Sequence, residues 1–139
     1  MAQRLLEHAL KNEPPPLKSL QVRSAGVSAY PGDRASENAI IALKKVGIDL
    51  KDHESQPLSG ELLSGALAVF CMTETHRQLI NSRFSPAPSQ VHLIREFLPA
   101  AQENEIPDPY GSDIRTYEAC RDSIVEAIPS ILRFLKTLV

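Results

Sequence analysis

One short segment, residues 67–72, constrains the fold of this chain more than any other. It reads Leu-Ala-Val-Phe-Cys-Met without a polar interruption, whereas a strand with one solvated face would alternate apolar and polar residues. A continuous apolar run of this length is typical of a strand buried on both faces, as in a parallel sheet covered by helices. Thr73 follows at once and is suited to cap a helix that runs to about Ser82. The segment therefore predicts an α/β fold with helices on both faces of a sheet.

Strand and helix signals alternate along the rest of the chain. Residues 20–25 and 91–94 are further short strand candidates. Apolar stripes at helical spacing, with capping residues, predict five helices: from Met1 to before Pro14, Ser36 to Gly47, Ser59 to Ser64, Thr73 to Ser82, and from Asp113 onward. Pro129 should kink or divide the last helix, because it removes one backbone hydrogen bond. We therefore expect residues 1–139 to form a single domain, a three-layer α/β/α sandwich with a parallel sheet.

Composition excludes several classes of partner. A net charge of −2 gives no reason to expect nucleic acid or an anionic membrane surface as a partner. The longest apolar run is too short to cross a bilayer, and the N-terminus does not have the pattern of a secretory signal. Two cysteines without a disulfide framework indicate reduced thiols and a cytoplasmic protein. The histidines lack paired spacing, so no metal site is predicted: His8, His53, His76 and His92.

Two motifs carry a family resemblance. Residues 22–30 read Val-Arg-Ser-Ala-Gly-Val-Ser-Ala-Tyr, and residues 106–110 read Ile-Pro-Asp-Pro-Tyr. Between them lie Gly-Ile-Asp-Leu at 47–50, His53 with Gln-Pro-Leu at 56–58, and Met-Thr-Glu at 72–74. In this order, over essentially the whole chain, they resemble the low-molecular-weight protein tyrosine phosphatase family. The resemblance implies phosphomonoester hydrolysis on phosphoproteins through a phosphocysteine, with no metal or organic cofactor.

The resemblance also implies roles for five residues. Asp108 matches the general acid, which protonates the leaving group and then activates water, although Asp-Pro pairs are also common in turns. Tyr110 and Tyr30 match the aromatic walls of the substrate cleft, with ring packing under a loop as the alternative. Ser24 and His53 match the pair that supports the phosphate loop, although a histidine in a turn is often only solvated.

The substrate stays open at this level between phosphotyrosine, phosphoarginine and arsenate. The residues from 56 to 73 are somewhat more similar to the bacterial phosphoarginine branch of the family. Arsenate reduction normally needs further cysteines near the acid loop, and the sequence has none there. Arsenate reductase activity is therefore the least favoured of the three.

The family's nucleophile loop is not found in these residues. The family opens with a strand and a Cys-x-x-Gly-Asn-x-Cys-Arg-Ser-Pro loop before a Met-Ala helix, whereas this sequence starts at Met1-Ala2. We therefore expect the sheet to lack its central first strand, between 20–25 and 67–72, with exposed edges open to self-association. Three explanations remain: a start codon assigned too late in a full phosphatase, a truncated pseudophosphatase that acts as an interaction module, or re-use of Cys71. In-frame upstream DNA that encodes the motif would favour the first.

A second cysteine motif is predicted to be a decoy. Cys71 and Arg77 satisfy Cys-x5-Arg between a strand and a helix, but no glycine lies between them to let a loop wrap closely around phosphate. Glu74 would also place a carboxylate beside a dianion. We expect Cys71 to be a buried strand residue with a raised pKa, and Cys120 to belong to the core or flank of the last helix. The chain as given is thus expected to be inactive.

Overall fold

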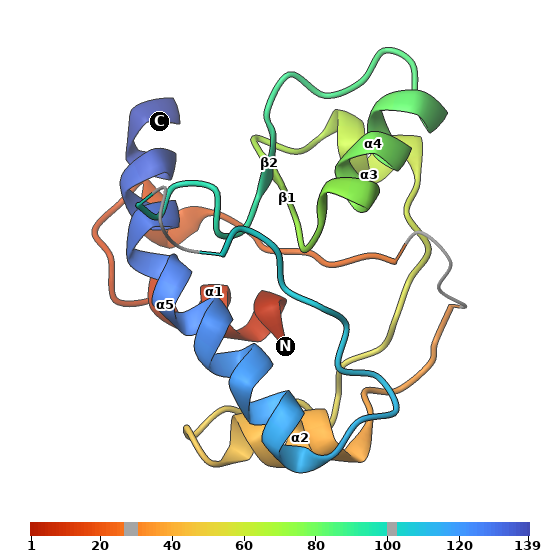
Figure 1. Cartoon of the computed structure of the whole chain (residues 1–139). Helices are drawn as coiled ribbons and strands as arrows, with labels where there is room; N and C mark the ends of the chain where they lie inside the picture. The colour runs from red at the N-terminus through yellow and green to blue at the C-terminus, as the bar shows by residue number, and fades with distance from the viewer. Residues whose placement is uncertain (27–30, 100–102) are drawn as a thin grey trace.

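The computed structural model describes residues 1–26, 31–99 and 103–139 (Figure 1). Helices and strands alternate in the central part of the chain, and a long helix closes it. The elements in order are α1 (Ala2–Leu10), the 3-10 turn η1 (Leu17–Ser19), α2 (Glu37–Lys44), α3 (Gly60–Ser64), β1 (Val69–Cys71), α4 (Glu74–Arg83), β2 (Val91–Leu93) and α5 (Ile114–Leu138). No helix in these three described stretches is long and apolar enough to cross a bilayer.

The sheet confirms the parallel arrangement predicted from the apolar run. β1 and β2 pair in parallel, with Phe70 opposite His92 and Cys71 opposite Leu93. Cys71 and Leu93 belong to a small core with α3 and α4, whereas Phe70 packs against a larger core formed by α1, α2 and α5. Helices therefore cover both faces of the sheet, with α3 and α4 on one side and α1 and α5 on the other (Figure 1). This is the predicted three-layer α/β/α arrangement.

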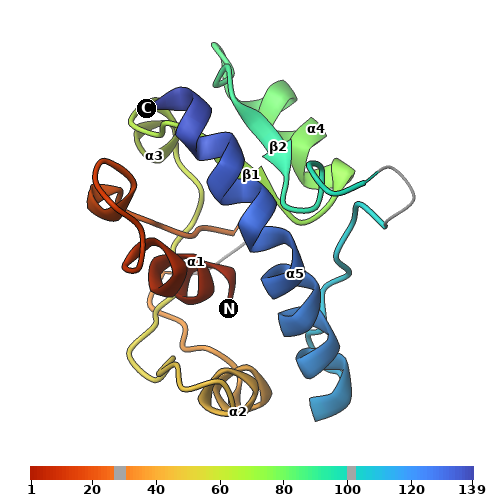
Figure 2. The same ribbon diagram turned by 90° about the vertical axis from the view of Figure 1, so that its left-hand side faces the viewer.

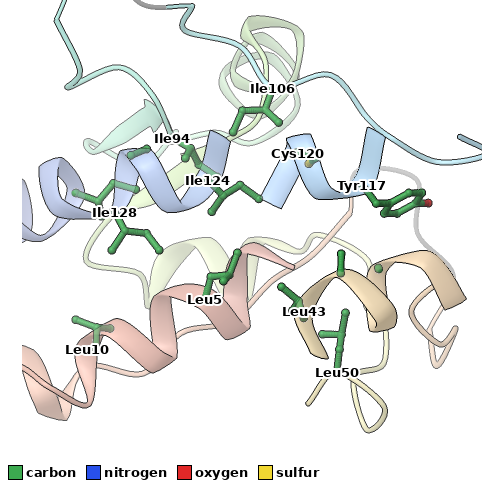
Figure 3. Close-up of a cluster of buried hydrophobic side chains, with 14 of the residues drawn as sticks. Leu5, Leu10, Leu43, Leu50, Ile94, Ile106, Tyr117, Cys120, Ile124 and Ile128 are labelled. Carbon is green, nitrogen blue, oxygen red and sulfur yellow. The ribbon is translucent and has the colours of Figure 1, made fainter. Parts of the chain in front are cut away.

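The larger core lies between α1, α2 and one face of α5 (Figures 2 and 3). Leu43 and Ala127 have no solvent exposure, and Leu5 and Ile124 are nearly fully buried. Truncation of a buried leucine or isoleucine to alanine typically costs about 2–5 kcal/mol of unfolding free energy. The apolar stripe of α5 therefore fixes the frame on which the candidate site is built.

Side-chain caps set the starts of three helices at the predicted residues. The hydroxyl of Ser36 accepts from the amide of Ala39, that of Ser59 from Leu62, and that of Thr73 from His76. Each bond satisfies an amide that has no partner within its helix. Gly47 follows α2 with a φ of 80°, a conformation that glycine adopts without steric cost.

Residues 20–25 do not form the predicted strand. Residues 20–25 form no ladder, and the next residue, Gly26, makes an isolated parallel bridge with Pro57. Strand pairing needs a neighbour with free backbone groups in register. β1 bonds to β2 through the amide of Val69 and the carbonyl of Cys71, and among the described residues no ladder joins its other edge to residues 20–25. The sequence pattern favoured a strand here but did not supply a partner.

Pro129 does not divide the last helix. α5 runs continuously from Ile114 to Leu138 with Pro129 inside it. Pro129 cannot donate to the carbonyl of Val125, the residue one turn before it. Both residues lie on the exposed face of α5, where water can satisfy that carbonyl. Of the two outcomes expected from the sequence, a kink or a division, the division does not occur, because the buried face of the helix holds both halves in one core.

Candidate functional site

A cavity of about 470 Å³ lies where six parts of the chain meet. Its walls come from the start of α1, residues 33–39 at the start of α2, residues 50–55, the start of α4, residues 106–109, and α5. We call it the acid-loop pocket. The polar and ionisable residues that line it are Asp33, Arg34, Ser36, His53, Ser55, Thr73, His76, Asp108 and Cys120.

The acid loop, residues 103–110, is attached to the end of the sheet. The amide of Ile106 donates to the carbonyl of Met72 at 2.9 Å, and the Ile106 side chain is only 2% exposed. Ile106 lies over the face of α5 that carries Cys120 and Ile124 (Figure 3). This anchor is two residues before Asp108, so the apolar contact of Ile106 determines where the aspartate enters the pocket.

Asp108 is both a turn residue and a lining residue of the pocket. Its Oδ1 accepts a hydrogen bond from the amide of Tyr110 at 3.0 Å, as in an Asx turn. The amide of Ser112 then donates to the carbonyl of Pro109 at 2.8 Å and closes the loop. The two interpretations made from the sequence, turn aspartate and pocket acid, are thus compatible in one geometry, since the turn uses a single carboxylate oxygen.

The structure brings only part of the predicted site together. His53 lines the same pocket as Asp108. Burial lowers the pKa of His53, and the positive charges of the N-terminal amine and Arg4 lower it further. Ser24 lies outside the pocket lining; its hydroxyl donates to Oε1 of Gln3 on α1 at 2.6 Å.

The two predicted aromatic walls are not seen in the pocket. Tyr110 is 81% exposed and does not line the cavity, whereas its neighbour Pro109 does. Tyr30 lies outside the residues that the structure describes. Neither ring therefore forms a described wall of the acid-loop pocket.

Several lining residues were not assigned to the site from the sequence, among them Asp33, Arg34, His76 and Cys120. Cys120 follows Tyr117 and precedes Ile124 at helical spacing, so its inward direction was visible in the α5 stripe. The position of Cys120 close to Asp108 could not be predicted from the sequence. Burial raises the pKa of Cys120, the N-terminal amine opposes that change, and the charge of Asp108 adds to it. Cys120 is thus a core thiol at the pocket wall rather than a thiolate.

The Cys71 motif is occupied by internal partners. Burial raises the pKa of the Cys71 thiol from 9.0 to about 11, against the opposing effect of Arg77. The Arg77 guanidinium forms ion pairs with Glu74 and, at 2.7 Å, with Glu96. The amide of Glu74, at the start of α4, already donates to a carboxylate oxygen of Glu105 at 2.7 Å. The groups that would bind a phosphate here are therefore already used.

The pocket combines a carboxyl group with basic side chains and no metal site. Within the described stretches no three His, Cys, Asp or Glu side chains are grouped as metal ligands require. Arg34, His53 and His76 can favour an anionic group in the pocket, and Asp108 can exchange a proton with it. This combination suits acid–base chemistry on a phosphorylated group.

Comparison with known proteins agrees with this interpretation. The family described as low molecular weight phosphotyrosine protein phosphatase matches residues 1–138. The chain is 35% identical over 118 residues to a protein-arginine-phosphatase of Bacillus subtilis, covering 85% of this chain and 77% of the relative. It is 28% identical over 138 residues to a probable low molecular weight protein-tyrosine-phosphatase, EpsP, of Ralstonia nicotianae, covering 99% and 88%. The solved YwlE arginine phosphatase of Geobacillus stearothermophilus superposes with a TM-score of 0.83 at 34% identity, covering 98% and 83%.

Proposed function

The chain belongs to the low molecular weight phosphotyrosine protein phosphatase family, and from this premise we propose that the acid-loop pocket is its phosphoprotein phosphatase site, with Asp108 as the general acid. The observation that carries the proposal is the carboxyl group of Asp108 in a cavity that is also lined by the basic side chains of Arg34, His53 and His76. A general acid must reach the leaving oxygen in its protonated form. The Asx turn with Tyr110 holds one oxygen of the carboxyl and leaves the other for the substrate.

The substrate is a phosphorylated protein side chain, and we propose phosphoarginine as the first candidate. Relatives named protein-arginine-phosphatase are 34–35% identical to this chain, whereas those named tyrosine phosphatases are 28–29% identical. Tyr110 is 81% exposed and lies outside the pocket lining, and Tyr117, the aromatic residue that does line the pocket, is only 5% exposed, so neither offers an open ring face to a phosphotyrosine. Phosphotyrosine remains the second candidate.

Neither thiol of this chain suits the nucleophilic step, so we propose that the 139 residues do not turn over phosphomonoesters by themselves. A cysteine nucleophile must be a thiolate at neutral pH. Burial raises the pKa of both Cys71 and Cys120 above its ordinary value. Free thiols in both positions support the cytoplasm as the compartment of the protein.

A non-catalytic interaction module is the alternative function, and one observation favours it. Val69 and Cys71 direct their ladder groups toward β2, so the N–H and C=O of Phe70 point to the other edge of β1. An unpaired edge beside residues 20–25 can accept a strand of a second copy. Light scattering tests this alternative, because a monomer at all concentrations would rule out self-association through the edge.

An activity assay with two preparations tests the proposed phosphatase site. One is the chain of 139 residues. The other is the product of the chromosomal gene, tagged after Val139, which would carry the family's nucleophile loop if the start codon has been assigned too late. With p-nitrophenyl phosphate and a phosphoarginine protein, we expect background hydrolysis from the first and turnover from the second. Turnover by the first that disappears in Cys71→Ser would overturn the proposal. Absence of turnover from both would leave the interaction module as the function.

A further inference from the structure

Arg95, just after β2, is a buried arginine that contacts the acid loop. It is only 5% exposed, although arginine is seldom buried without partners. Its Nε donates to the carbonyl of Glu103 in the acid loop at 2.5 Å. One terminal nitrogen donates to the carbonyl of Ser123 on α5 at 2.9 Å, and the other reaches Glu126 at 3.3 Å. The fork of one side chain thus joins β2, the acid loop and α5.

The charge of Arg95 is balanced mostly by backbone. Glu126 is its only ion-pair partner in the described residues, and that carboxylate is 53% exposed. A buried cation is costly unless its donors are satisfied, so the guanidinium stays in place only while both carbonyl acceptors are present. The position of Arg95 therefore depends on the acid loop, and the position of the loop depends on Arg95.

Two further bonds hold the loop after Glu103. A carboxylate oxygen of Glu105 accepts from the amide of Glu74 at the start of α4, and the amide of Ile106 donates to Met72. These anchors attach the loop to the end of β1 and to α4. Arg95 attaches it by hydrogen bonds to α5, the helix against which Ile106 also packs and which supplies Tyr117 and Cys120 to the pocket wall.

We propose that Arg95 is the positioning residue of the acid loop: it fixes residues 103–106 against α5 and thereby sets where Asp108 enters the pocket. The proposal rests on the proposed function of that pocket. Lysine cannot replace Arg95, because one ammonium group cannot reach the Glu103 and Ser123 carbonyls in the planar geometry of the guanidinium. The distance between Asp108 and α5 is then a property of the Arg95 fork.

Arg121 provides a matched control. Its side chain is also buried, at 11% exposure, and also donates to a backbone carbonyl of another element, that of Ala42, at 2.9 Å. It joins α5 to α2 and has no contact with the acid loop. Arg95→Met and Arg121→Met therefore each remove one guanidinium that joins α5 to another part of the fold, but only the first removes an anchor of the acid loop.

Amide hydrogen exchange tests the proposal on the 139-residue chain. The probe is the amide of Ile106, compared within each variant to the amide of Val69, which donates to Gln90 at 2.8 Å in the sheet. Arg95→Met and Arg95→Lys should lower the protection of Ile106 relative to Val69 by about 10-fold or more, the size expected for a lost hydrogen bond to a charged group. Arg121→Met should leave this ratio unchanged.

Two results would overturn the positioning role. One is an unchanged ratio in Arg95→Met, and the other is an equal fall of the ratio in both methionine variants, which would indicate general destabilisation. A variant too unstable for the comparison is replaced by Arg95→Lys, which retains a positive charge at the site. Because exchange follows the loop backbone, the result does not depend on whether Asp108 transfers a proton, which the activity assay decides separately.

Discussion

Residues 71–77 and residues 106–110 both carry a motif of phosphoryl-transfer chemistry, but the fold treats them differently. At the first, carboxylates of the chain itself occupy the helix start and the arginine, through Glu105 on the Glu74 amide and through Glu74 and Glu96 on Arg77. At the second, Asp108 lines a cavity. The comparison shows that one sequence motif can have its donors and acceptors occupied by the chain itself while another presents a carboxyl group to a cavity.

The largest expected effect is on turnover, and it separates the two regions directly. In the preparation that hydrolyses substrate, Asp108→Asn should lower kcat by about 10²- to 10⁴-fold, because the amide cannot protonate a leaving group. Cys71→Ala should leave kcat within about 2-fold, since a buried thiol with a raised pKa does not take part. Steady-state kinetics of both variants provide the measurement. A reversed order of the two effects would exchange the roles assigned to the two regions.

The second largest effect is expected on the alkylation rate of the Cys71 thiol. With a pKa of about 11 against an ordinary 9.0, Cys71 should react with iodoacetamide at pH 8 about 100-fold more slowly in the folded than in the unfolded chain. The raised pKa also means that this group contributes stability below pH 9 and that the contribution is lost as the pH rises from 9 to 11.

The pH dependence of the unfolding free energy is compared between the wild-type protein and Cys71→Ala. Wild-type protein should lose more unfolding free energy between pH 9 and pH 11 than Cys71→Ala does, by at most about 3 kcal/mol. Denaturant unfolding at several pH values measures it, with alkylation sites found by mass spectrometry. Rapid labelling of Cys71 in folded protein at pH 7 would contradict the burial of this thiol.

A smaller effect is expected at the cap of α4, which follows Cys71. Thr73→Ala removes the acceptor for the His76 amide and should cost about 1 kcal/mol of unfolding free energy. Ser36→Ala removes the corresponding cap of α2 and should cost a similar amount. Urea unfolding of both variants measures the two costs. A much larger loss for Thr73→Ala than for Ser36→Ala would mean that Thr73 stabilises residues 71–77 through contacts other than the helix cap.

The smallest effect tests whether the Glu105 carboxylate fills the position at the start of α4 that an anion would otherwise take. Glu105→Ala removes the carboxylate at the start of α4 and should cost about 0.5 kcal/mol, because the helix N-terminus loses a favourable negative charge. Sulfate should restore part of this loss in Glu105→Ala but not in Glu105→Gln, which keeps an acceptor in place. Thermal unfolding with and without sulfate measures the difference. Equal stabilisation of Glu105→Ala and Glu105→Gln by sulfate would show that the Glu105 carboxylate does not fill a position where an anion can bind.

Several features of the site follow from sequence patterns that act over a few residues. Ser36, Ser59 and Thr73 cap the predicted helices, because a hydroxyl and the amide three residues later are brought together by the chain itself. The position of Asp108 on the pocket wall agrees with the role that the family resemblance implied. The role itself remains a prediction until the kinetics are measured.

Other features were not visible, because they depend on contacts between distant parts of the chain. The division expected at Pro129 does not occur, since the core on the other face of α5 holds the helix together. Residues 20–25 show no ladder in the described structure, although their pattern suits a strand. Arg95 was not singled out from the sequence, since nothing local indicated its bond to Glu103.

The sequence by itself determined the order of strands and helices, their caps and the buried stripe of α5, because periodicity and capping act within one or two turns. Tertiary structure alone decided which motif presents a carboxyl group to the cavity and which has its arginine and helix start occupied by carboxylates of the chain. That choice depends on Glu105 reaching α4 and on Arg95 reaching the acid loop and α5. Such contacts join segments brought together only when the sheet and helices pack, and no local pattern specifies them.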